Sequence, residues 1–180
     1  MMRICFANQL EYRLFINIYR MFTIAMQALP LGILAAIVTF IIMVLWEKMK
    51  GPRLKRGQRW NFVLFSAYLM VLFEITIFSR TIGSVDVIDL IPFNTPGGIR
   101  YILLFAMANV VMFIPFGILA PKIFKVLRSP KRCFALGFLT SVSIELIQFV
   151  LKCGVVQTED VITNIIGIEI GYWIYEKWIK

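Results

Sequence analysis

The feature that most constrains this chain is its division into long apolar stretches separated by short basic segments. A helix needs about 20 residues to cross a bilayer core of about 30 Å. The candidate stretches are residues 21–46, 60–79, 101–120, 133–151 and 161–178. Hydrophobic residues make up 60% of the 180 residues, against roughly 45–50% in soluble domains. The sequence therefore predicts an all-α integral membrane bundle of about five transmembrane helices.

The Lys and Arg residues predict how the bundle is oriented. Thirteen of the 19 lie after the first and third stretches or in the C-terminal tail, and six lie on the other side. Cytoplasmic loops are enriched in these residues, so we expect a multi-pass plasma-membrane protein with the N-terminus outside and the C-terminus inside. Residues 1–20 would form an interfacial N-terminal helix or a frayed terminus. Residues 21–79 would form two helices around a basic cytoplasmic loop, and residues 80–180 a core of three helices.

Several classes of function are disfavoured by composition. The net charge of +9 lies in short loops beside apolar stretches, which favours membrane topology over nucleic-acid binding. The chain has no His, and its three cysteines are far apart in sequence. We therefore expect no metal site and no cofactor.

Polar residues inside the apolar stretches are the candidate site. Ionisable groups within a membrane are costly and usually face partners or a polar cavity. From the helical rise, Glu74 lies roughly 9 Å inward of Arg80, Glu145 roughly 10 Å inward of Lys152, and Asn109 roughly 13 Å inward of Arg100. With Asp160 and Asn164 they form one layer near the outer face, for which Arg80 and Lys152 are the candidate cations.

Helical spacing sharpens this layer. Ser141, Glu145, Gln148 and Lys152 follow one stripe of the fourth stretch, because residues about four apart share a helix face. In the fifth stretch Asp160, Asn164, Gly167 and Gly171 do the same. Gly167 and Gly171 form a GxxxG motif, which permits a close approach to another helix. Glu169 falls off this face. The alternative is that the amides and hydroxyls only join helices by hydrogen bonds.

The segment DLIPFN at 89–94 and the Pro and Gly residues after it form a turn-rich outer loop. Its apolar residues, including Pro92 and Phe93, favour a re-entrant or lid-like loop. A plain connector is the alternative.

From about residue 80 to the end, the chain resembles the VanZ-like family. The resemblance lies in DLIPFN at 89–94, NVVMFIPFG at 109–117, ELIQF at 145–149 and EDVITNIIG at 159–167. It is carried by Pro92, Phe93, Asn109, Pro115, Phe116, Gly117, Glu145, Gln148, Gly154, Asp160, Asn164 and Gly167. The chain departs from the usual pattern at Asp89 and Gln157. The resemblance implies a membrane protein associated with low-level teicoplanin resistance.

Together these observations predict a non-catalytic cell-envelope function, in which an outward-facing polar site contacts membrane lipids, lipid-linked cell-wall molecules or a lipoglycopeptide. The candidate residues are Glu145, Asp160, Asn164, Gln148, Asn109, Arg80, Glu74, Pro92 and Phe93. The alternatives are an intramembrane enzyme acting on a lipid or lipid-linked cell-wall intermediate and a small lipid transporter. The sequence leaves open whether the chain forms a homo-oligomer.

Overall fold

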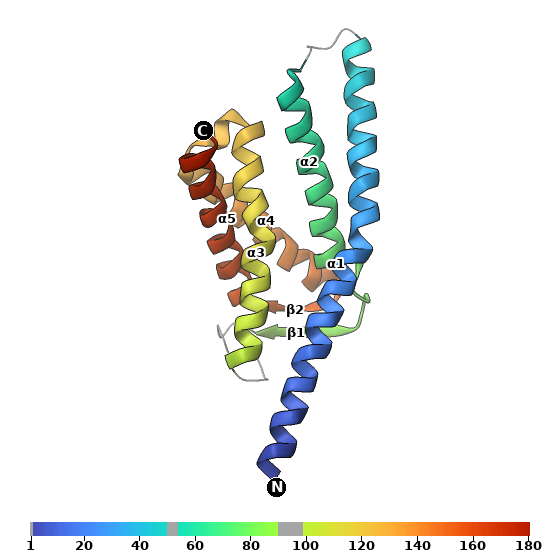
Figure 1. Cartoon of the computed structure of the whole chain (residues 1–180), viewed down its shortest axis with the longest axis vertical. Helices are drawn as coiled ribbons and strands as arrows, with labels where there is room; N and C mark the ends of the chain where they lie inside the picture. Colours follow the sequence, from blue (N-terminus) through green and yellow to red (C-terminus); the bar gives the residue numbers. More distant parts are fainter. Residues whose placement is uncertain (1, 50–53, 90–98) are drawn as a thin grey trace.

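The computed structural model describes residues 2–49, 54–89 and 99–180. In this part of the chain, five helices and two short strands form the fold (Figure 1). The elements are α1 (Met2–Lys48), α2 (Arg56–Phe73), the π-helical segment η1 (Glu74–Phe78), β1 (Val85–Asp89), α3 (Ile99–Ile123), the short 3₁₀ helix η2 (Lys125–Arg128), α4 (Pro130–Leu151), β2 (Cys153–Gln157) and α5 (Thr158–Trp178). The predicted all-α class is confirmed.

Four of the helical segments are long and apolar enough to cross a membrane. They are Leu14–Lys48, Arg56–Phe78, Ile99–Ile123 and Pro130–Leu151. Helix α5 has the length of a span but carries Glu159, Asp160, Glu169 and Glu176. A fifth span and the orientation of the bundle therefore stay predictions. The helix that begins at Met2 continues without interruption into the first apolar stretch, so residues 2–20 extend α1.

The helices form two groups. Helices α1 and α2 lie side by side, whereas α3, α4 and α5 form the second group, in which α3 packs most closely on α5 (Figure 1). Helix α2 also contacts α3 and joins the two groups. The buried core includes Leu72 of α2, Phe113 and Phe116 of α3, and Ile168 and Tyr172 of α5.

Glycines allow α3 and α5 to pack with their backbones almost in contact. A Cβ on Gly171 would overlap the carbonyl oxygen of Ile114, and one on Gly167 would overlap that of Val110. Gly117 of α3 faces α5 in the same way. The predicted role of the GxxxG motif in a close helix contact is thus confirmed. Small residues serve this purpose in membranes, where helices gain little from hiding apolar surface from lipid.

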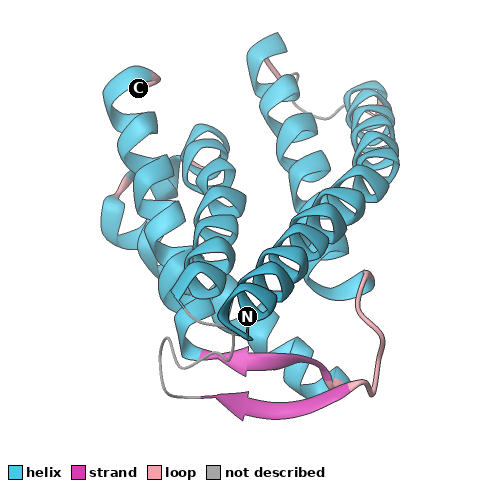
Figure 2. Cartoon of the chain, turned by 60° about the horizontal axis from the view of Figure 1, so that its bottom comes forward, coloured by secondary structure: helices cyan, strands magenta, loops and turns pink. Residues whose placement is uncertain are grey.

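Strands β1 and β2 form a parallel pair that the sequence analysis did not predict. Val85 pairs with Cys153, and Asp89 pairs with Gln157. Figure 2 shows the two strands side by side at one end of the helices. Lys152, with a φ of 51°, ends α4 and turns the chain into β2. Strand β1 ends at Asp89, the first residue of the expected outer loop. The rest of that loop, including the predicted residues Pro92 and Phe93, lies outside the described residues.

We expect Gly171→Ala to destabilise the fold by about 1–3 kcal/mol, the usual effect of overpacking. In a helix, alanine is normally more stabilising than glycine. A loss of stability in Gly171→Ala would therefore come from the overlap of the new Cβ with Ile114. The free energy of unfolding of the purified protein in detergent measures this. Gly57→Ala in α2 is the matched control, because a Cβ there meets nothing within 4 Å. Equal stability of the two variants would contradict the close contact.

Candidate functional site

A cavity of about 1030 Å³ lies where the two groups of helices meet. Its apolar wall comes from α1, α2 and α3, with Ile24, Val71, Leu72, Phe105 and Met112 among its residues. Its polar residues come mainly from the segment that follows η1, from α3, from α4 and from α5. The cavity opens to the surroundings, because Arg80 and Val111 in its lining are exposed.

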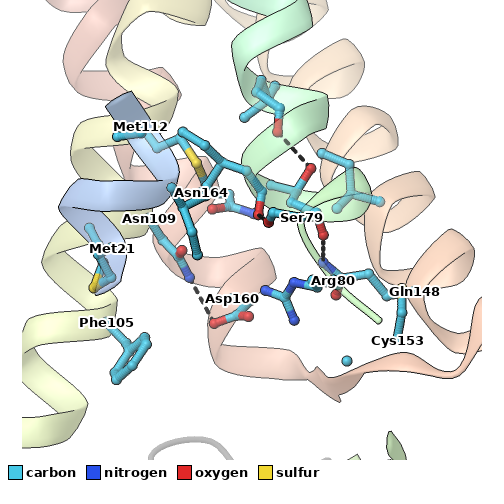
Figure 3. Close-up of a pocket in the computed structure, with 18 of the residues that line it drawn as sticks. Met21, Ser79, Arg80, Phe105, Asn109, Met112, Gln148, Cys153, Asp160 and Asn164 are labelled. Carbon is cyan, nitrogen blue, oxygen red and sulfur yellow. Dashed lines mark hydrogen bonds between the residues drawn. The ribbon is translucent and has the colours of Figure 1, made fainter. Parts of the chain in front are cut away.

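The structure brings six of the nine predicted residues to this cavity. They are Arg80, Asn109, Glu145, Gln148, Asp160 and Asn164. Figure 3 shows five of them by label, on α3, α4, α5 and the segment that follows η1, which are far apart in sequence. That these residues bind a ligand stays a prediction.

Helix α4 contributes three buried polar side chains on one face, Ser141, Glu145 and Gln148. The Oε2 atom of Glu145 accepts a hydrogen bond from the backbone N–H of Gln157 at 3.1 Å. Gln157 immediately precedes α5, so the carboxylate lies near the positive end of that helix dipole. Gln148 donates from Nε2 to the carbonyl oxygen of Thr76 in η1 at 2.8 Å.

Helix α5 contributes Asp160 in its first turn and Asn164 one turn later. Asp160 Oδ1 accepts a hydrogen bond from Asn109 Nδ2 of α3 at 2.7 Å (Figure 3). Asn164 Nδ2 donates to Ser141 Oγ of α4 at 2.9 Å. The bond between Asn109 and Asp160 forms because α3 packs closely on α5. The bond between Asn164 and Ser141 forms because α4 contacts α5.

Among the described residues, two cations belong to the cavity lining, Arg20 of α1 and Arg80, and the second is the one predicted from the sequence. In Figure 3 the side chain of Arg80 lies between Asp160 and Gln148. Its guanidinium occupies the space beside Gly154, where an added Cβ would be only 2.5 Å from Nη1. Glu145 and Asp160 line the same cavity as Arg80. The other candidate cation, Lys152, is exposed at the end of α4 and does not line the cavity.

The other three predicted residues are Glu74, Pro92 and Phe93, and the structure describes only the first of them. Glu74 is half-buried in η1 and is not part of the cavity lining in the described structure. Pro92 and Phe93 fall outside the described residues. Glu169 is exposed on α5, in agreement with its predicted place off the polar face.

The structure adds partners that the sequence analysis did not name. The carbonyl of Thr76 is one, and the contact of Arg80 with Gly154 is another. The family resemblance included Gly154 but attached no role to it. The local signal in the sequence is a glycine three residues after the end of the fourth apolar stretch.

We expect Asn109 and Asp160 to be energetically coupled. A double-mutant cycle with Asn109→Ala and Asp160→Ala should give a coupling of about 0.6–1.7 kcal/mol, the range for side-chain hydrogen bonds in membranes. The measurement is again unfolding in detergent. Asn109→Ala with Glu176→Ala is the control pair, since Glu176 is exposed and pairs with Lys180. Additive effects for the first pair would contradict the hydrogen bond.

Comparison with known proteins identifies the family. The family model described as VanZ/LLP1 matches residues 62–179, which include every element of the cavity except α1. The Enterococcus faecium protein described as Protein VanZ is 32% identical over 133 residues, or 69% of this chain and 75% of that protein. No solved structure gives a significant match. The chain therefore belongs to the VanZ/LLP1 family.

Proposed function

We propose that this chain is a multi-pass plasma-membrane protein that protects the cell envelope by binding lipid-anchored molecules in its cavity, without catalysing a reaction. A lipoglycopeptide such as teicoplanin would then be less potent against cells that carry the protein. The single observation that carries this proposal is a cavity that combines an apolar wall with a charged end.

The wall suits an acyl chain. Ligand pockets in proteins commonly measure about 300–1,000 Å³, and this cavity is at the upper limit of that range. Leu72 is fully buried beneath it, and Val71, Phe105 and Met112 are half-buried along it. Aliphatic and aromatic side chains of this kind bind hydrocarbon without any polar group that would need a partner.

The charged end suits a head group. Arg80, Glu145 and Asp160 offer both a hydrogen-bond-donating cation and accepting carboxylates. A molecule with an acyl chain and a polar head would satisfy both parts of the cavity at once. A glycopeptide without an acyl chain, such as vancomycin, would satisfy at most one.

The bundle supports an outward-facing site. The C-terminal end of α1, the N-terminal ends of α2 and α4, and the C-terminus lie at one end of the bundle, opposite the two strands (Figure 1). Most Lys and Arg residues lie near that end, so the positive-inside rule would place it in the cytoplasm. The polar end of the cavity, beside β2, would then face the outer leaflet.

A susceptibility assay in a Gram-positive host tests this proposal. Expression should raise the minimum inhibitory concentration of teicoplanin but not of vancomycin, and Glu145→Gln or Asp160→Asn should abolish the rise at matched membrane levels. Glu176→Gln is the control, because its exposed carboxylate is far from the cavity lining. Full protection by both site variants would rule out the site, and no protection by the wild type would rule out this function.

Gly154→Ala offers a milder test of the same site. The added methyl group should displace the flexible end of Arg80 and leave the helices in place, so teicoplanin protection should fall while the protein level stays normal. Gly57→Ala should keep full protection, since its Cβ meets no other atom within 4 Å. Unchanged protection with Gly154→Ala would show that Arg80 does not act from this position.

Catalysis on a lipid-linked cell-wall intermediate is the alternative, and the two carboxyl groups at one cavity favour it. General acid–base chemistry uses two such groups when their environments differ. Incubation of the purified protein with labelled lipid-linked precursors, with and without Mg²⁺, separates the two functions. Turnover that Glu145→Gln abolishes would replace the binding proposal.

A further inference from the structure

Arg20 of α1 lines the cavity without an acceptor for its guanidinium group. Its side chain makes no hydrogen bond or ion pair with the residues that the structure describes. The carboxylates of the lining differ from it, because each has a donor within the protein. Glu145 accepts a hydrogen bond from the backbone N–H of Gln157, and Asp160 accepts one from Asn109. The group that would complete the lining is therefore an anion for Arg20.

Arg20 and Arg80 lie toward the same end of the first two helices. Gly32 of α1 packs against Ala67 and Val71 of α2. From that contact, Arg20 lies roughly 18 Å toward the N-terminal end of α1, at a rise of about 1.5 Å per residue. Arg80 lies roughly 13 Å beyond Val71 at the same rise. Because α1 and α2 are consecutive and run in opposite directions (Figure 1), both distances point to the same end of the bundle.

This end lies at the depth of lipid head groups when the second helical segment spans a bilayer. Ala67 is at the middle of that segment, Arg56–Phe78, so its contact with Gly32 marks the midplane. A hydrocarbon core of about 30 Å ends about 15 Å from its midplane. Arg20 and Arg80 therefore lie near the boundary at which the phosphates of membrane lipids begin.

The exposed charges of the described cavity lining are both positive. Arg20 and Arg80 are exposed, whereas Glu145 is buried and Asp160 is half-buried. An anion that enters from the opening would therefore meet the guanidinium groups before either carboxylate. Guanidinium groups bind phosphate through paired N–H donors, and phosphate is an anion that membrane amphiphiles carry at this depth.

We propose that Arg20 and Arg80 bind the phosphate group of an amphiphile whose acyl chains occupy the apolar wall. This inference rests on the proposed function, since it names the class of head group that the same cavity takes. Arg20 precedes residues 62–179, which match the family. Helix α1 thus supplies a cation from outside the family-matched segment.

Native mass spectrometry of the purified full chain in detergent tests the inference with two lipids of equal acyl chains. Phosphatidylglycerol carries a phosphate, and diacylglycerol does not. The wild type should bind phosphatidylglycerol at least about tenfold more tightly than diacylglycerol, a difference of about 1.4 kcal/mol. Arg20→Gln should lower the binding of phosphatidylglycerol toward that of diacylglycerol. It should leave the binding of diacylglycerol unchanged, because the apolar wall is intact.

Arg100→Gln is the matched control. Arg100 is an exposed cation in the first turn of α3 and is not part of the described cavity lining, so this variant should bind both lipids as the wild type does. An equal loss of phosphatidylglycerol binding in the two variants would overturn the site in favour of general attraction to a basic surface. Glycerol phosphate, which has the phosphate but no acyl chain, should not displace phosphatidylglycerol at an equal concentration. Displacement would overturn the amphiphile in favour of a free phosphate.

The wild-type comparison decides the inference even if a variant fails to fold. Equal binding of the two lipids would overturn the phosphate site, since Arg20 would then face only water or bulk head groups. That result would leave the proposed binding of acyl chains intact. Failure of both lipids to bind would contradict the proposed function as well.

Discussion

The structure depends on one constraint: polar groups buried within apolar helices must find their partners inside the protein, because hydrocarbon offers none. Glu145 meets this requirement through the backbone N–H of Gln157, and Asp160 through Asn109. These bonds join α4 to the segment before α5, and α3 to α5. The same contacts that satisfy the polar groups thus hold the three C-terminal helices in register and gather the carboxylates at one end of the cavity.

The fold combines a close contact between α3 and α5 with a cavity between the two groups of helices. Gly117, Gly167 and Gly171 let α3 and α5 approach each other until their backbones touch. Helices α1 and α2 lack such a contact with α5, and the space left between the two groups is the cavity. The glycines therefore bring Asn109 to Asp160, and the separation of the helix groups lets a ligand reach them.

The helices and most of the candidate site could be predicted because their signals are local. A carboxylate such as Glu145 stands out in an apolar run, and helical spacing identifies its face. The β1–β2 pair could not be predicted, since Val85 and Cys153 are far apart in sequence and no local pattern encodes their pairing.

Glu74 was expected in the polar layer from the regular rise of an α-helix. It lies instead in the π-helical segment η1, whose wider turns change the face that each residue occupies. The position of Arg80 beside Gly154 depends on a tertiary contact between two distant segments. The spacing of residues in the sequence does not reveal such a contact.

Photo-crosslinking tests the central claim, that the cavity holds an acyl chain, most directly. A lipid with a photoreactive group on its acyl chain would be activated with the protein in bilayers, and the adducts located by mass spectrometry. The account predicts adducts at Val71, Phe105 and Met112 in the cavity wall, which an excess of unlabelled lipid and the Glu145→Gln variant both reduce. Adducts confined to the exposed outer faces of the helices, at residues such as Val150 and Trp173, and unchanged in the variant would contradict it.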